Sequence, residues 1–278
     1  MKDSHSPEAG PLFSVVTISL NQAEFLARAI DSVVGQQGVR IQYIICDPGS
    51  GDGSRDIIDS YGNAIDVRIY ERDRGPADGL NRGFAHATGD IYAYLNSDDT
   101  FLPGAFAQVA AHFAERPETD ILVGHSLATD RHDRVLRRIW SVPYRPRFVA
   151  YGVCSHLQPS TFFRAQAFRR TTGFNPANRY AWDGELLLDM FLSGARIEVI
   201  DSFLSTYRLH GDSITNTGTG ETEIRRFFEN RFAKLIGRNP RRYDALISRL
   251  YWLWTRTMSP RIPIERLRGG RIYKRGAE

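Results

Sequence analysis

The sequence predicts an α/β fold in which a mainly parallel sheet is flanked by helices. Three observations support this prediction: short β-branched runs alternate with amphipathic segments, the connections between them are short, and polar residues follow successive runs. Alternation of this kind requires crossover connections, which give a parallel sheet covered on both faces. In such a sheet, ligands bind at the carboxyl ends of the strands.

The first hundred residues contain the regular part of this pattern. The predicted strands cover residues 13–19, 42–47, 67–70 and 91–95. The helices between them carry apolar residues at helical spacing over residues 25–34, 57–61 and 80–87. Asn21 is expected to cap the first helix, and Gly62 and Gly89 are expected to end the second and third.

After about Gly104 the alternation is less regular. The predicted elements are a helix over 105–113, a strand over 121–123, a hairpin over 131–140, a helix over 185–193 and a strand over 196–200. Two amphipathic helices follow beyond Gly220, with apolar faces over residues 224–236 and 246–258.

Composition excludes several classes of protein. Of the 278 residues, 42% are hydrophobic and 24% are charged, which is typical of a folded globular chain rather than a disordered one. The two cysteines, Cys46 and Cys154, exclude a disulfide framework and a Cys-x-x-Cys metal or redox motif. The sequence has no apolar run near the ~20 residues of a membrane span, and residues 1–10 are polar, so we expect a cytoplasmic protein.

The charge is unevenly distributed. Residues 221–278 hold 15 Lys and Arg against 6 Asp and Glu, although the whole chain has a net charge of only +4. We therefore expect a disordered tail over 1–10, an α/β domain over 11–218 and a basic helical extension over 219–278.

The extension suggests an anionic partner. Arg242, Arg249 and Arg256 recur every seven residues beside an apolar stripe that includes three aromatic residues, Tyr251, Trp252 and Trp254. This pattern suits a helix at an anionic membrane surface, although the stripe could instead pack on the body or form a dimer contact. No nucleic-acid module is recognisable, so nucleic acid is not an expected partner.

Two segments carry residues suited to binding a nucleotide. Asn96-Ser-Asp-Asp99 ends the fourth strand with paired carboxylates, which could hold Mg²⁺ or Mn²⁺ on a diphosphate or could simply cap a turn. Asp47-Pro-Gly-Ser-Gly-Asp-Gly-Ser54 is a glycine-rich loop that allows close approach of a ligand, and Asp47 could accept a hydrogen bond from a pyrimidine N–H. Neither a Walker loop nor a G-x-G-x-x-G motif is present, which disfavours ATPase and dinucleotide-binding functions.

Four motifs together resemble the family 2 glycosyltransferases of the GT-A fold, whose sheet is Rossmann-like. They are Ser14-Val-Val-Thr-Ile-Ser-Leu-Asn21, the glycine-rich loop, Asp73-Arg-Gly-Pro-Ala-Asp-Gly-Leu-Asn-Arg-Gly83 and Thr88-Gly-Asp-Ile-Tyr-Ala-Tyr-Leu-Asn-Ser-Asp-Asp99. The resemblance extends more loosely to about residue 217. It implies a GT-A catalytic domain with a donor half over 11–104 and an acceptor half over 105–218.

The resemblance also implies an activity. An inverting, non-processive enzyme would transfer one sugar from a nucleotide-diphosphate sugar, with a UDP-sugar favoured, to a glycan or lipid-linked acceptor. Mn²⁺ or Mg²⁺ would assist. Processive relatives carry membrane spans and a Gln-x-x-Arg-Trp motif, and the sequence contains neither.

Residue roles follow from the same resemblance. Asp47 would hold the base, Asp99 would hold the metal, and the other donor-site residues would be Ser19, Asn21, Gly49, Ser50, Arg74, Asp78, Asn81, Asn96 and Asp98. His210, in Tyr207-Arg-Leu-His-Gly-Asp-Ser213, would return to the metal or the diphosphate. An imidazole ligand favours Mn²⁺ over Mg²⁺.

The acceptor side is carried by two later segments, Gln158-Pro-Ser-Thr-Phe-Phe163 and Tyr180-Ala-Trp-Asp-Gly-Glu-Leu-Leu-Leu188. By motif position, Asp183 would be the catalytic base and Glu185 the alternative. The predicted acceptor-side residues are His156, Gln158 and Trp182. Gly184 and Asp189 depart from the family pattern, which leaves the choice of base open.

Two other functions stay open at this point. A sugar-phosphate nucleotidyltransferase would need a glycine-rich basic loop after the first strand, and Ser19-Leu-Asn-Gln22 has no glycine. A non-catalytic nucleotide-binding or scaffold protein on the same fold would not need the intact set Asp98, Asp99 and Asp183.

Overall fold

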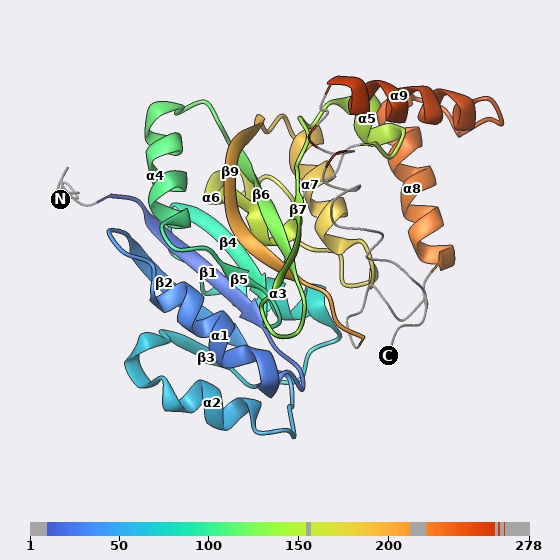
Figure 1. Cartoon of the computed structure of the whole chain (residues 1–278). Helices are drawn as coiled ribbons and strands as arrows, with labels where there is room; N and C mark the ends of the chain where they lie inside the picture. Colours follow the sequence, from blue (N-terminus) through green and yellow to red (C-terminus); the bar gives the residue numbers. More distant parts are fainter. Residues whose placement is uncertain (1–9, 154–156, 212–220, 259–260, 262–263, 265–278) are drawn as a thin grey trace, which may run out of the picture.

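A single mixed sheet forms the centre of the computed structural model, which describes residues 10–153, 157–211, 221–258, 261 and 264 (Figure 1). Its strands are β1 (Leu12–Ile18), β2 (Arg40–Cys46), β3 (Val67–Ile69), β4 (Ile91–Asn96), β5 (Thr100–Phe101), β6 (Ile121–Thr129), β7 (Val135–Ile139), β8 (Thr161–Arg164) and β9 (Ile197–Arg208). Their order is β3-β2-β1-β4-β8-β6-β9-β5, with β7 beside β6.

The helices are α1 (Ala23–Val34), α2 (Ser54–Ser60), α3 (Pro76–Ala85), α4 (Ala105–Glu115), α5 (Pro146–Ala150), α6 (Ala165–Arg169), α7 (Trp182–Leu192), α8 (Glu221–Ile236) and α9 (Asp244–Met258). Two 3₁₀ turns, η1 (Gly62–Ala64) and η2 (Gln158–Ser160), complete the described elements. The predicted α/β architecture with flanking helices is therefore confirmed.

The parallel part of the sheet is built by the first half of the chain. β1 pairs in parallel with both β2 and β4, and β2 pairs in parallel with β3. β8 then joins antiparallel to β4 and β6, while β9 runs parallel to β6. The ends of β1, β2 and β4 consequently lie at one edge of the sheet.

Both faces of the sheet are covered, which explains why its strands are apolar at consecutive positions. One core cluster contains Val15 with residues of α1, α2 and α4, and the other contains Val16 with residues of α3, α6 and α7. Gly83 allows α3 to lie directly on β1, because a Cβ at this position would stand 2.4 Å from Cγ1 of Val16.

The predicted N-cap of α1 is wrong. Asn21 adopts a positive φ of 53°, a left-handed conformation that Asn tolerates, and α1 begins two residues later. The first turn is capped instead from another loop, where Asp52 Oδ2 accepts a hydrogen bond from the Ala23 N–H at 2.9 Å. This arrangement leaves the Asn21 side chain directed to the glycine-rich loop.

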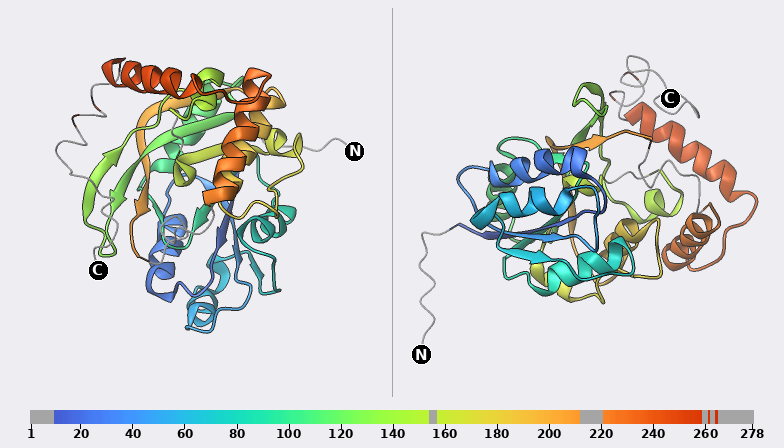
Figure 2. Two further views of the ribbon diagram at one scale, coloured as in Figure 1. Left: turned by 90° about the vertical axis from the view of Figure 1, so that its right-hand side faces the viewer. Right: turned by 90° about the horizontal axis from the view of Figure 1, so that it is seen from below.

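The two last helices lie beside α5, on the side of the molecule away from α1 and α2 in both views of Figure 2. The ring of Tyr151, at the end of α5, stands 5.3 Å from that of Phe232 on α8 and 5.3 Å from that of Tyr251 on α9. None of the helices in the described part of the chain is long and apolar enough to cross a membrane.

His125 on β6 makes the stability of the fold sensitive to pH. Its Nδ1 accepts a hydrogen bond from the Ser141 N–H at 3.1 Å, so the ring is neutral there, and Nε2 lies 3.2 Å from Asp201 Oδ1. Burial lowers the pKa of His125 below its usual 6.5, with Asp201 opposing the effect. An unfolded chain binds the proton at the higher pKa, so stability falls as the pH drops below about 6.5.

We therefore expect a lower urea midpoint at about pH 5 than at neutral pH. In His125→Asn, whose side chain can still accept the Ser141 hydrogen bond, the dependence on pH becomes shallower. An unchanged slope in this variant would assign the effect to other groups.

Candidate functional site

Polar residues meet where β1, β2 and β4 end. The Ser19 N–H donates to the carbonyl of Cys46, and the Asp47 N–H donates to the carbonyl of Ile69, both at 2.9 Å. The Ser97 N–H donates to the carbonyl of Ile18 at 3.2 Å. These bonds extend the strand pairing beyond the strands themselves. The polar residues that follow neighbouring strands are therefore held side by side at this edge of the sheet.

Asp47 is fully buried at this edge, and one of its oxygens organises the glycine-rich loop. Oδ1 accepts hydrogen bonds from the Gly49 N–H at 3.1 Å, the Ser50 N–H at 2.8 Å and Arg55 Nε at 3.2 Å. The Arg55 guanidinium also lies over the ring of Tyr70, 4.7 Å from its centroid. Arg55 was not predicted, because its partner is eight residues away and only the loop geometry brings them together.

Asn21 and Ser50, both predicted at the donor site, are joined directly. The Asn21 N–H donates to Ser50 Oγ at 2.8 Å, and Asn21 Oδ1 accepts from the Gly51 N–H at 3.0 Å. These two hydrogen bonds join the loop after β1 to the loop after β2, and so fix the relative position of the two loops.

Four buried side-chain atoms at this edge have no hydrogen-bond partner within the part of the chain that the structure describes. They are Ser19 Oγ, Asp47 Oδ2, Asn96 Oδ1 and Asp99 Oδ2, which follow or end three neighbouring strands. A buried polar atom without a partner costs about 1–3 kcal/mol, so such atoms are usually satisfied by a ligand or by water. Their clustering marks a place built to receive a polar ligand.

Asp98 and His210 face each other across the site. Asp98 Oδ2 lies 3.0 Å from Nε2 of His210, whose ring stands 4.8 Å from that of Phe25 on α1. The structure therefore brings together two residues that are 112 positions apart. A carboxylate oxygen and an imidazole nitrogen this close fit two ligands of a divalent cation whose other ligands come from a diphosphate.

Asp99 has a different environment. It is buried to 1% exposure, its Oδ1 accepts a hydrogen bond from the Arg208 N–H at 2.9 Å, and its Oδ2 has no partner among the described residues. Burial, followed by the nearby charge of Asp98, raises the pKa of Asp99 well above its usual range. Asp99 is thus the more buried of the two carboxylates, whereas Asp98 is partly exposed.

Arg208 holds this arrangement together and was not predicted. Its fully buried side chain donates from Nε to the Asp98 carbonyl at 2.7 Å and from Nη2 to Asp133 Oδ1 at 2.6 Å. The residues before it, Ser205-Thr-Tyr207, are polar, so no sequence signal marked Arg208 as a buried residue. In the described chain, no group of three or more His, Cys, Asp or Glu side chains is arranged to hold a metal ion by itself.

Three of the predicted donor residues, Arg74 before α3 and Asp78 and Asn81 within it, already have partners within the protein. Arg74 Nη2 lies 2.9 Å from Asp78 Oδ1, and this bond lowers the pKa of Asp78. Both ends of the Asn81 amide bind the backbone of Phe174, at 2.7 and 2.9 Å. Asn81 therefore fixes the acceptor half against α3, and its predicted contact with the donor stays a prediction.

The two candidate catalytic carboxylates are clearly distinguished by their surroundings. Glu185 accepts hydrogen bonds from Asn175 Nδ2 at 3.2 Å and from Asn178 Nδ2 at 2.7 Å, which secures the loop before α7. Asp183 lies in the first turn of α7 and is partly exposed. Burial, and then the charge of Asp183, raises the pKa of Tyr94 on β4.

The predicted acceptor-side residues lie in different environments. Gln158 is buried and links η2 to β4, because its Nε2 donates to the Tyr94 carbonyl at 2.9 Å and its Oε1 accepts from Asn96 Nδ2 at 3.2 Å. Trp182 packs in the core, with its ring 5.6 Å from those of Tyr94 and Phe174, and its predicted contact with the acceptor stays a prediction. His156 lies outside the described residues.

Comparison with known proteins gives consistent matches. The family model described as glycosyl transferase family 2 matches residues 14–174. A protein of Nostoc named as an uncharacterized glycosyltransferase is 27% identical over 213 residues, which cover 71% of this chain and 65% of the relative. A PGL/p-HBAD biosynthesis glycosyltransferase of Mycobacterium bovis is 31% identical over 120 residues, 42% of this chain and 47% of the relative. The matches thus span less than two thirds of these relatives.

Solved structures share the fold. TarS 1–349 of S. aureus, in complex with UDP-GlcNAc, superimposes with a TM-score of 0.66 at 16% identity, covering 92% of this chain and 74% of that one. The mannosyltransferase PcManGT of Pyrobaculum calidifontis, in complex with GDP-Man and Mn²⁺, gives a TM-score of 0.61 at 17% identity, covering 96% and 78%.

Proposed function

Because the chain belongs to glycosyl transferase family 2, we propose that it transfers one sugar from a nucleotide-diphosphate sugar to an acceptor hydroxyl, with inversion. The observation that carries the proposal is the cluster of unsatisfied polar atoms at the ends of β1, β2 and β4. These atoms lie at the carboxyl edge of a parallel sheet, where α/β proteins bind nucleotides.

In this proposal, Asp47 binds the base of the donor nucleotide. Its Oδ1 is occupied by the glycine-rich loop and by Arg55, so its Oδ2 is left to accept a hydrogen bond from a base N–H. A carboxylate can accept from the imide N–H that uracil and thymine share, and UDP is the donor nucleotide that we favour from the family resemblance. A likeness to structures bound to UDP-GlcNAc and to GDP-Man supports a nucleotide-sugar donor.

Asp98 and His210 would hold a divalent metal, Mn²⁺ or Mg²⁺, and the imidazole favours Mn²⁺. When bound, such a cation acts as a Lewis acid that stabilises charge on the departing diphosphate. Asp99, the metal ligand predicted from the sequence, supports the turn that presents Asp98, because its Oδ1 is bound to the Arg208 backbone. Its buried Oδ2 is still unpartnered among the described residues, so Asp99 stays the alternative metal ligand.

Asp183 acts as the general base. A carboxylate at the partly exposed start of α7 can accept the proton of the acceptor hydroxyl as that oxygen attacks the anomeric carbon. A single displacement of this kind inverts the anomeric centre. Glu185, whose oxygens are bound by Asn175 and Asn178, is assigned to hold the loop.

The acceptor in this proposal is a glycan or a lipid-linked sugar, and the protein works in the cytoplasm as a peripheral protein at the membrane face. The basic extension supports this location, since residues 221–278 hold 15 Lys and Arg against 6 Asp and Glu.

Calorimetric titration with UDP, GDP, dTDP and CMP tests the donor site, with each nucleotide measured in Mn²⁺, in Mg²⁺ and in chelator. We expect one diphosphate to bind preferentially, and more tightly with metal. The sugar nucleotides of the preferred base then form the panel for transfer assays.

A further inference from the structure

Helix α9 presents an apolar stripe to solvent. Leu246, Leu250 and Leu253 are 61%, 56% and 54% exposed, and Trp254 beside them is 44% exposed. Spacings of four, three and one residues place these side chains along one face of the helix. Exposed apolar side chains in a continuous stripe indicate an interaction surface rather than ordinary surface variation.

The opposite face of α9 is anchored to the body, so the stripe faces outward in a fixed orientation. Ser248 Oγ donates to the Tyr151 carbonyl at 2.8 Å, and the Tyr151 hydroxyl donates to Asp244 Oδ1 at 3.0 Å. Asp244 also accepts from both terminal nitrogens of Arg238, at 2.7 and 2.8 Å. The packing of the extension on the body, one of the predicted alternatives, therefore accounts for one face of α9 only.

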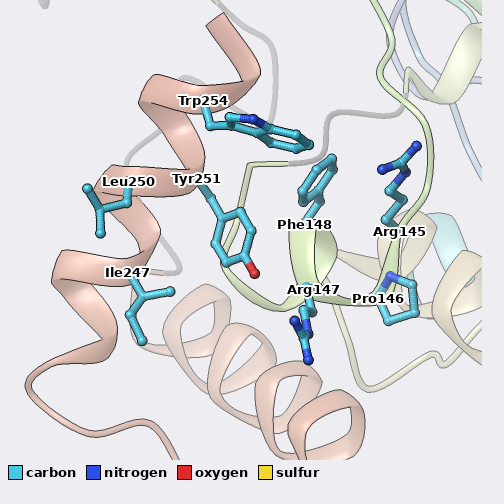
Figure 3. Close-up of a pocket in the computed structure, with 8 residues that line it drawn as sticks. All are labelled: Arg145, Pro146, Arg147, Phe148, Ile247, Leu250, Tyr251 and Trp254. Carbon is cyan, nitrogen blue, oxygen red and sulfur yellow. The ribbon is translucent and has the colours of Figure 1, made fainter. Parts of the chain in front are cut away.

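A groove of about 780 Å³ separates α9 from α5 next to the stripe (Figure 3). Its aromatic side is formed by Phe148, whose ring stands 5.3 Å from that of Trp254 and 5.6 Å from that of Tyr251. The residues that line it are Arg145, Pro146, Arg147, Phe148, Ile247, Leu250, Tyr251 and Trp254. The lining is apolar and aromatic except for the two arginines.

Positive charge surrounds this surface. Arg145 and Arg147 are exposed on the α5 side of the groove, and Arg242 and Arg249 are exposed at the start and in the middle of α9. Asp244 is the only acidic residue within α9, and it is buried and paired with Arg238. An apolar stripe with a basic rim, and with no exposed acid on the described residues of α5 and α9, is complementary to a layer of anionic headgroups over acyl chains.

We propose that this α5–α9 surface docks on an anionic phospholipid bilayer, with the leucine stripe and Trp254 at the acyl boundary and the four arginines among the headgroups. Two copies of this chain joined through the same surface would bring their arginine rims together, which disfavours a dimer here. Arginine stems can also lie along apolar surface while their guanidinium groups stay in the polar layer.

Co-sedimentation of the full chain with vesicles tests the proposal, and no donor nucleotide is needed, so the outcome is separate from that of the transferase proposal. We expect binding to phosphatidylcholine vesicles that contain phosphatidylglycerol, and little binding to phosphatidylcholine alone. In Leu246→Ser/Leu250→Ser/Leu253→Ser, partitioning falls about tenfold or more, because the buried apolar area is lost.

Matched variants distinguish binding through this surface from nonspecific hydrophobic binding to vesicles. Val135→Ser/Leu136→Ser removes apolar side chains that are 58% and 38% exposed on β7, and we expect it to bind vesicles like the unaltered chain. Arg145→Gln/Arg147→Gln should weaken binding and reduce its dependence on salt. All these positions are exposed, so circular dichroism and urea midpoints should stay unchanged.

Three results would overturn the proposal. The first is the absence of binding to anionic vesicles, and the second is equal weakening by the β7 control. The third is a dimer in solution that the leucine variant dissociates, which would assign the surface to a second copy.

Discussion

Replacing Asp183 with Asn should nearly abolish sugar transfer while leaving the donor site intact. General-base catalysis contributes about 10²–10⁴-fold to rate, so we expect a loss of that size in the turnover number. The amide has nearly the shape of the carboxylate, and Asp183 lies in the first turn of α7, whereas the atoms proposed to bind the donor follow or end β1, β2 and β4. Turnover is measured as release of the nucleotide diphosphate from the donor sugar, and donor binding by calorimetry.

Glu185→Gln is the matched control, because the two residues are two positions apart on the same helix. The Gln side chain can no longer accept as strongly from Asn175 and Asn178, so we expect lower resistance to urea and turnover within a few-fold of normal. Near-normal turnover in Asp183→Asn, together with a large loss in Glu185→Gln, would reverse the assignment of the base.

Removing either Asp98 or His210 should abolish the metal dependence of nucleotide binding. Their oxygen and nitrogen lie 3.0 Å apart, and each variant, Asp98→Ala or His210→Ala, deletes one of the two atoms. We expect the affinity for the preferred diphosphate in Mn²⁺ to fall about 10–100-fold, the range typical of changes that disturb a metal site. Titration calorimetry in Mn²⁺ measures this loss directly.

Titration in chelator is the internal control, since the affinity without metal should be similar in both variants and in the unaltered chain. Asp99→Asn provides the competing test. We expect it to keep most of the metal dependence, because Asp99 is buried and its Oδ1 is bound to the Arg208 backbone, which leaves only its Oδ2 for a ligand. If only Asp99→Asn lost the metal dependence, Asp99 would be the metal ligand, as predicted from the sequence.

The donor half could be predicted because its determinants are local. β1, β2 and β4 are short apolar runs separated by helices with their own periodicity, and each predicted strand coincides with an observed one to within a few residues. β9 extends over twelve residues, of which the sequence pattern predicted only the first part. Its remainder is determined by pairing with β6 and β5, which are far away in the chain.

The site shows the same division. Asp47, Asn21 and Ser50 were predicted from loops that directly follow strands, and the structure brings them together. Arg55 and Arg208 were not predicted, because their roles arise from contacts that no sequence spacing reveals. Side chains alternate between the two faces of the sheet only as far as Asn96, where β4 ends. The sequence pattern therefore could not determine whether Asp98 or Asp99 faces the site.

The most direct test of the central claim is the calorimetric titration of the unaltered chain with UDP, in Mn²⁺ and then in chelator. The account predicts saturable binding to one site, stronger in Mn²⁺, that exceeds the binding of GDP, dTDP and CMP. Tighter binding of another nucleoside diphosphate would change the nucleotide that we assign to the donor, but it would still support a donor site at this edge of the sheet. No binding of any nucleotide, with or without metal, would contradict a donor site at the ends of β1, β2 and β4.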